Sequence, residues 1–153
     1  MAKSTQFDTI TAHQHFSQQC FNQAWDLMEK PDRTDLEDQQ MIQLNQASIW
    51  HWTQRDDCTP QHLSVGFWQT SRIYSLLEQP DNAVRYGQLS LDYGARTTPF
   101  YRGYAYEALA RAEQLAGNRD RMNEYLKKAR EAAEAVTNAE EKEMLLSDLA
   151  SIK

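Results

Sequence analysis

The sequence contains the pair Thr-Pro twice, at Thr59-Pro60 and at Thr98-Pro99. Threonine is a favourable N-cap residue, and proline suits the first position of a helix because the N–H that it lacks would have no partner there. Both pairs therefore predict helix starts, and they lie about 39 residues apart, the length of a helical hairpin with its turns. The spacing indicates a chain built from stacked helical hairpins, because one hairpin alone cannot bury its apolar face.

Apolar side chains recur every three or four residues along most of the chain, which is typical of amphipathic helices. With the helix starts and ends, this spacing predicts hairpins at about 9–56, 60–94 and 99–137 and a last helix at about 139–152. Every connection between them is short. We therefore expect residues 1–153 to form a single all-α domain, a short α-solenoid of about seven helices with a C-terminal capping helix.

Local signals support these helix boundaries. Thr34 with Glu37, and Asn138 with Glu141, have the spacing of capping boxes, in which each side chain satisfies a free backbone N–H of the other residue. Gly94 and Gly117 are predicted to end helices in the left-handed conformation that glycine adopts easily. Asn118 is predicted to cap the helix that follows it.

Composition excludes several classes of function. The net charge of −6 and the acidic character argue against a nucleic-acid partner and against docking on anionic lipid. The two cysteines lack the spacing of a disulfide framework or a metal motif, so we expect reduced thiols. No apolar segment has the length of a membrane span or of a signal peptide core. We expect a soluble cytoplasmic protein with no cofactor and no metal.

The two hairpins aligned on Pro60 and Pro99 resemble tetratricopeptide repeats. Small and apolar residues fall at that family's positions in both helices, namely Ser71, Tyr74, Ala83 and Ser90 in one hairpin and Leu109, Ala110 and Ala129 in the next. Gly117 falls where a glycine closes the first helix of the family's repeat, and Glu78 stands at this place one hairpin earlier. The last helix resembles the capping helix of such arrays. The resemblance implies a concave groove lined by the first helix of each hairpin.

The whole chain also resembles a group of small bacterial proteins of this repeat type that has no assigned activity. The matching motifs are Ser48-x-x-His51-Trp52, Trp68-x-x-Ser71-Arg72-x-Tyr74, and the run from Ala105 to Ala112. This resemblance implies a shared site or a shared packing scheme, and it supplies no function.

Helical phasing from Gly117 places four residues of the last hairpin on the groove face: Tyr104, Glu107, Arg111 and Gln114. The equivalent residues one hairpin earlier are Val65, Trp68, Arg72 and Ser75, and a looser alignment of the first hairpin gives Gln19, Gln23 and Asp26. Arg72 and Arg111 are in register, and an arginine fork suits a carboxylate or a phosphate. The alternative is that Glu107 and Arg111 form an ordinary i,i+4 ion pair on a packing helix, and that Trp68 only stacks on Arg72.

His51 is the titratable residue that most suggests chemistry. It lies beside Trp52 on the face of its helix that should pack inward, and a histidine with a pKa near neutrality can serve as an acid or a base. Catalysis would also require an orienting carboxylate or a nucleophile within reach. The alternative is a hydrogen-bonded, partly buried histidine with a structural role.

Three functions follow from these residues. The first is a non-enzymatic binding or scaffold module that holds a peptide or a small acidic ligand in the groove, with a protein or peptide partner. The second is a small-molecule enzyme that uses His51 as its acid or base. The third is a structural unit that oligomerises with copies of itself.

Overall fold

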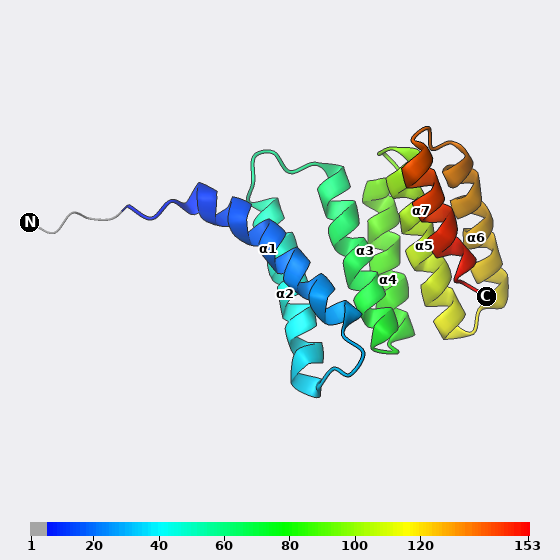
Figure 1. Ribbon diagram of the computed structural model, residues 1–153, viewed down its shortest axis with the longest axis horizontal. Coiled ribbons are helices and arrows are strands. Elements are labelled where there is room, and N and C mark those ends of the chain that lie inside the picture. Colours follow the sequence, from blue (N-terminus) through cyan, green and yellow to red (C-terminus); the bar gives the residue numbers. More distant parts are fainter. Residues whose placement is uncertain (1–5) are drawn as a thin grey trace, which may run out of the picture.

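The computed structural model describes residues 6–153, and within them the chain forms seven α-helices (Figure 1). Helices that follow one another along the chain pack as antiparallel pairs, and α7 packs on α5 and α6 at the C-terminal end. The predicted all-α fold of helical hairpins is confirmed. The bounds are α1 Thr9–Glu29, α2 Asp35–Thr53, α3 Pro60–Leu76, α4 Pro80–Gly94, α5 Pro99–Ala116, α6 Arg119–Glu134 and α7 Ala139–Ala150.

Most helix starts lie where the local signals predicted them. Thr34 accepts from the N–H of Glu37 (3.2 Å) and donates its own N–H to the Glu37 carboxylate (2.8 Å), which confirms the capping box of α2. Pro60 and Pro99 are the first residues of α3 and α5. The main difference in length is at α2, which ends at Thr53, slightly before the expected end near Asp56.

The turn after the first helix has the same backbone form in the second and third hairpins. Gly117 follows α5 with φ of +79°, and Glu78 follows α3 with φ of +57°, the only non-glycine residue in 6–153 with positive φ. These residues occupy equivalent places in the two hairpins, so the repeat predicted from Pro60 and Pro99 extends to the turns. A left-handed conformation costs glutamate about 1 kcal/mol more than glycine.

Two predicted helix-end roles are wrong. Gly94 is the last helical residue of α4 and is not left-handed; a Cβ atom there would lie 2.6 Å from Ser64 Oγ, so this glycine is required by close contact of α4 with α3. Asn118 precedes α6 but its side chain makes no capping bond. Its amide donates instead to the buried carboxylate of Glu113 (2.7 Å), because the preceding turn brings that acceptor near.

The C-terminal part of the chain packs through small residues. Alanine and glycine on α5 leave room for neighbouring helices, and a Cβ atom at Gly103 would lie 2.5 Å from Leu145 of α7. This allows α7 to close the end of the solenoid, as a capping helix would. The core of this part consists of Ala110, Met122, Leu126, Ala129, Ala133, Leu145, Leu149 and Ile152.

The first hairpin joins the rest of the chain through a small apolar cluster of Met28, Met41 and Ile73 and through a buried polar network. Asn45 of α2 donates to the carbonyl of Gly66 (3.2 Å) and to the side chain of Gln69 (3.1 Å), and accepts from Thr70 (2.7 Å). Gln69 in turn donates to the carbonyl of Phe21 in α1 (3.1 Å). One amide of α3 thus holds both helices of the first hairpin.

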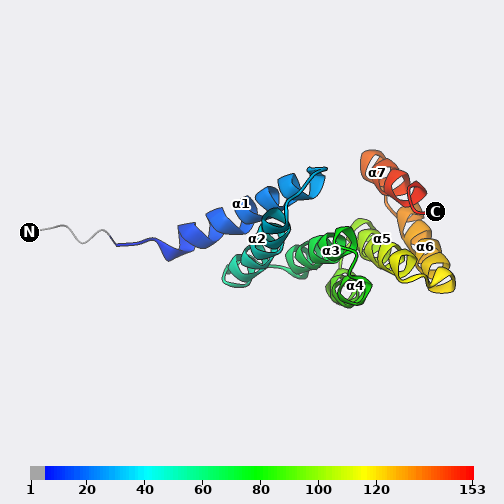
Figure 2. The ribbon, with the colours of Figure 1, turned by 90° about the horizontal axis from the view of Figure 1, so that it is seen from below.

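The arrangement of the helices creates a concave side. Figure 2 shows the C-terminal end of α1 and the whole of α7 on the same side of the row formed by α3 and α5, with α4 on the other side. α3 and α5 lie next to each other and pack directly. A surface formed by α3 and α5 is therefore bordered by α1 at one edge and by α7 at the other.

Candidate functional site

A cavity of about 310 Å³ lies on the concave side, between α3 and α5 and beneath α7. Most of its wall comes from α3 and α5, because these helices present equivalent faces to the same space. α1 contributes Trp25 and α7 contributes Met144 and Asp148. Its lining residues are Trp25, Ser64, Val65, Trp68, Arg72, Ser90, Phe100, Tyr101, Tyr104, Glu107, Arg111, Met144 and Asp148.

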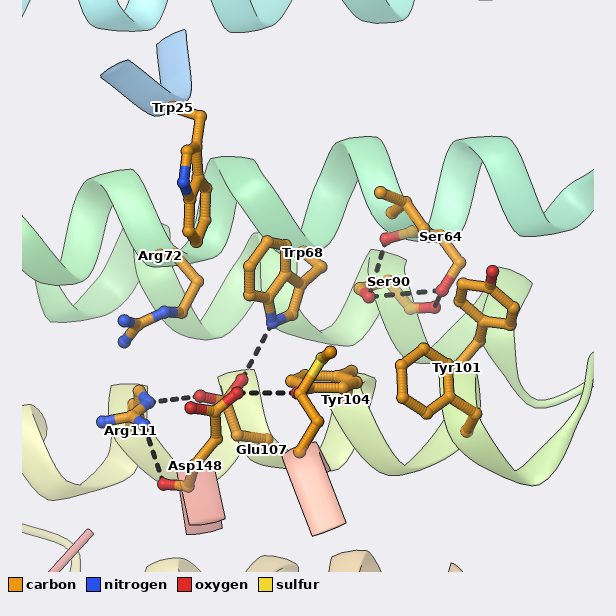
Figure 3. A pocket seen from close by; sticks show the side chains of 13 residues that line it. Trp25, Ser64, Trp68, Arg72, Ser90, Tyr101, Tyr104, Glu107, Arg111 and Asp148 are labelled. Carbon is orange, nitrogen blue, oxygen red and sulfur yellow. Dashed lines mark hydrogen bonds and ion pairs between the residues drawn. The ribbon is translucent and has the colours of Figure 1, made fainter. Parts of the chain in front are cut away.

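Glu107 lies at the centre of the cavity wall and is almost fully buried, with 1% of its surface exposed. One of its oxygens accepts from the indole N–H of Trp68 (2.8 Å), and the other forms an ion pair with Arg111 one turn later (Figure 3). Both oxygens are thus used within the protein. The buried carboxylate links α3 to α5 through residues that occupy equivalent positions in their hairpins.

Arg111 is held on its other side by α7. Its guanidinium donates to the main-chain carbonyl of Asp148 (3.0 Å) and to the hydroxyl of Ser151 (2.7 Å). Arg111 therefore fixes the C-terminal end of α7 to α5. The sequence allowed two interpretations of Arg111, a residue of the groove or a member of an ordinary i,i+4 ion pair. In the structure Arg111 is both, because the Glu107–Arg111 pair lines the cavity.

Asp148 and Tyr104 form a second contact between α7 and α5. The Tyr104 hydroxyl donates to one carboxylate oxygen of Asp148 at 2.6 Å. Burial, followed by the hydrogen bond to Asp148, raises the pKa of Tyr104 well above its ordinary value, so the hydroxyl remains a neutral donor at physiological pH. The other Asp148 oxygen, Oδ1, accepts no hydrogen bond from residues 6–153.

Arg72 differs from the other charged residues of the cavity. Its Nε is buried and has no hydrogen-bond partner, and the guanidinium forms no ion pair among residues 6–153. Burial lowers the pKa of Arg72, while the nearby charge of Glu107 acts in the opposite direction. An arginine remains protonated under these conditions, so a positive charge without an ion-pair partner is held against the cavity (Figure 3).

Aromatic rings form the rest of the wall. Trp25 of α1 stacks on Trp68 of α3 with ring centroids 5.7 Å apart and an interplanar angle of 23°. Tyr104 meets Trp68 edge to face at 5.8 Å, and Phe100 meets Tyr104 edge to face at 5.1 Å. Flat apolar surfaces next to a few polar groups are typical of pockets for small ligands.

Trp52 lies outside this cavity. It lines a second hollow of about 340 Å³ between α1 and α3, which shares Val65 and Tyr101 with the first. Its ring is enclosed by His62, stacked at 4.0 Å, and by the Arg55 guanidinium, 4.0 Å from the ring centre. The structure therefore places Trp52 beside the candidate site but does not bring it together with Arg72 or Glu107.

His51 is separate from both hollows. Its Nδ1 lies 2.8 Å from Nδ1 of His13 in α1, and its ring contacts Phe16. Burial, and then the charge of His13, lower the pKa of His51 below its ordinary value. Among the described residues, His51 forms its side-chain hydrogen bond with His13 and none with a carboxylate.

Among the predicted groove residues, Gln114 also lies outside the cavity. Its amide donates to the carbonyl of Lys153 at 2.5 Å, because the chain after α7 runs beside it. In the first hairpin, Gln19, Gln23 and Asp26 do not line the cavity. Trp25 lines it instead, one position away from Asp26.

In comparisons with known proteins, no family model, curated protein or solved structure matches this chain. Within residues 6–153, no helix is long and apolar enough to cross a membrane. The described residues also contain no group of three or more histidine, cysteine or acidic side chains placed to hold a metal ion. Cys20 and Cys58 are both free thiols, as their spacing predicted.

Proposed function

We propose that the protein is a non-enzymatic binding module of tetratricopeptide type that holds a carboxylate-bearing ligand, a peptide end or a small acid, in the cavity between α3, α5 and α7. The observation that carries this proposal is Arg72, a largely buried guanidinium without a partner. A buried charge without a partner is costly, and a bound carboxylate would remove that cost through paired hydrogen bonds.

The surroundings of Arg72 support an anion with an apolar body. Arg111 lies next to it, but its charge is paired with Glu107, so Arg72 supplies the positive charge for the anion. The rings of Trp25, Trp68 and Tyr104 supply flat apolar contact surface for the remainder of the ligand. His51 and Gln114, which point to other partners, have no part in this proposal.

Two matched probes test the proposal. N-acetyl-L-phenylalanine carries a free carboxylate like the end of a peptide, and N-acetyl-L-phenylalaninamide differs only in lacking that charge. Titration calorimetry should show binding of the acid and at least about tenfold weaker binding of the amide, since hydrogen bonds to a charged group contribute about 1.5–3 kcal/mol. Equal affinity for the two probes, or no binding of the acid, would contradict the proposal.

The variant Arg72→Met should lose binding of the acid while the free energy of unfolding stays equal or rises by about 1 kcal/mol, because an uncompensated buried charge is removed. Arg96→Met, on the exposed turn after α4, is the matched control and should change neither quantity. If Arg72→Met binds the acid as the wild type does, the assignment of Arg72 is wrong.

Self-association is a second candidate function, favoured by one observation. Large apolar side chains are exposed where α1 starts and α2 ends, with Phe7 76%, Ile10 70% and Trp50 59% exposed. Two copies related by a twofold axis would cover this end of both chains at once. Light scattering should then give a mass above the 17.8 kDa of one chain, and Phe7→Ser with Trp50→Ser should restore the monomer mass.

A further inference from the structure

The charges that line the cavity are not equally available to a ligand. Glu107 and Arg111 form an ion pair, the second Glu107 oxygen accepts from Trp68, and Arg111 Nη2 donates to Ser151 and to the main-chain carbonyl of Asp148. A ligand that displaced these contacts would have to break the connection between α5 and α7. Glu107 and Arg111 are therefore best regarded as part of the wall.

Two charges remain, and they have opposite signs. Arg72 forms no ion pair, and Nε has no hydrogen-bond partner. Asp148 forms no ion pair among residues 6–153 either, and it uses one carboxylate oxygen for Tyr104 while Oδ1 is left without a donor. Oδ1 is reached by solvent, and Asp148 lines the cavity.

These two groups border one space. Figure 3 shows the Arg72 guanidinium reaching from α3 and the Asp148 carboxylate reaching from α7, with Trp68 and Tyr104 beside them. The two side chains are near enough for the charge of Asp148 to act on Arg72, although they form no ion pair. A space between opposite, separated charges favours a ligand that carries both charges over one that carries a single charge.

We propose that the ligand is a small zwitterion with an aromatic side chain, namely a free aromatic α-amino acid, whose carboxylate binds Arg72 and whose ammonium binds Asp148. The ring lies against Trp25, Trp68 and Tyr104. The cavity volume of about 310 Å³ suits one such molecule and lies at the lower end of the range for ligand pockets, about 300–1,000 Å³. This inference rests on the proposed function, because it keeps the carboxylate at Arg72 and adds a second contact.

Three probes that share a phenylethyl unit separate the possibilities: L-phenylalanine, 3-phenylpropionate without the amine, and 2-phenylethylamine without the carboxylate. Titration calorimetry on the full chain should give the highest affinity for L-phenylalanine. Each of the other two should bind at least about tenfold more weakly, since each leaves one charge of the cavity wall without a partner on the ligand.

Each result has a distinct meaning. If 3-phenylpropionate binds as tightly as L-phenylalanine and depends on Arg72, the zwitterion is wrong and the acid-binding function stands. If 2-phenylethylamine binds as tightly as L-phenylalanine and Arg72→Met has no effect on either affinity, the zwitterion and the acid-binding function are both wrong. If none of the three binds, the zwitterion is wrong, and the result with N-acetyl-L-phenylalanine decides the proposed function.

The variant Asp148→Asn tests the second contact directly. Asparagine keeps an acceptor for Tyr104 and removes only the charge, so the fold should be unaffected. L-phenylalanine should bind about tenfold more weakly, and 3-phenylpropionate should bind as before or more tightly. Asp56→Asn, on the exposed loop after α2, is the control. Unchanged affinity of Asp148→Asn for L-phenylalanine would overturn the inference.

Discussion

The first hairpin and the part of the chain from α3 onward are joined in different ways. From α3 onward, helices approach through glycine, alanine and serine, and α7 covers the end. The first hairpin is attached to α3 through a small apolar cluster of Met28, Met41 and Ile73 and through the buried polar contacts of Asn45 and Gln69, and its outer end exposes large apolar side chains. A large close-packed core resists rearrangement, whereas an interface with a small apolar cluster and a polar network opens at a lower free energy. We infer a stable unit of α3–α7 with a more easily displaced hairpin that carries Trp25 to the cavity.

The largest expected effect comes from Leu109→Ala. Leu109 is fully buried, and its side chain fills the space left by Gly87 between α5 and α4. The cavity that it leaves should lower the free energy of unfolding by about 2–5 kcal/mol in urea denaturation. Leu115→Ala on the same helix, where the side chain is 37% exposed, is the matched control. Similar losses for both variants would show that α5 does not form the core of a stable unit.

Asn45→Ala tests the polar connection. Its removal leaves Gln69 without a donor to its side-chain oxygen and the Thr70 hydroxyl with only the carbonyl of Gly66. We expect a loss of about 1–3 kcal/mol. Hydrogen exchange should show faster opening of α1 and α2, with α5 and α6 unaffected. Uniformly faster exchange along the chain would mean that the two parts unfold together.

The two equivalent turns provide a smaller test within the stable part. Glu78→Gly removes a left-handed glutamate and should raise the free energy of unfolding by about 0.5–1 kcal/mol, whereas Gly117→Ala should lower it by about 1 kcal/mol. A Cβ atom at Gly117 would meet no neighbouring atom, so conformation alone decides the result there. Thermal unfolding should show stability changes of opposite sign for the two variants. Changes of the same sign would contradict the equivalence of the two turns.

The smallest expected effect is the pH dependence of the first hairpin. Because the pKa of folded His51 is lowered, the unfolded chain binds a proton more readily as the pH falls through about 6.5. The stability that depends on a neutral His51 is therefore fully present above about pH 6.5 and decreases at lower pH. The melting temperature should fall slightly between pH 7.5 and 5.5, and His51→Gln should reduce this fall. A fall of equal size in the variant would assign the effect to other groups.

Local signals were sufficient to predict the fold. Capping boxes, Thr-Pro starts and helical periodicity are read over a few residues, and the turns at Glu78 and Gly117 confirm the repeat in the backbone. The same phasing placed six residues of α3 and α5 that line the cavity, namely Val65, Trp68, Arg72, Tyr104, Glu107 and Arg111.

The remaining parts of the site depend on how helices cross, which periodicity does not determine. Trp25 and Asp148 reach the cavity because of the angles at which α1 and α7 meet the central helices. Gln114 was expected in the groove, and the chain end after α7 occupies it instead. His51 was expected to face inward, and it does so toward His13, a partner from another helix that its own sequence neighbourhood could not indicate.

The contact between Trp68 and Glu107 makes the order of the hairpins specific. The two residues occupy the same position in successive hairpins, yet one is a donor and the other an acceptor. Two copies of the α3–α4 hairpin in tandem would place tryptophan opposite tryptophan, and two copies of the α5–α6 hairpin would place two carboxylates together. Simple duplication of either hairpin would therefore lose this donor–acceptor pair, and an engineered longer array would keep it by alternating the two kinds of hairpin.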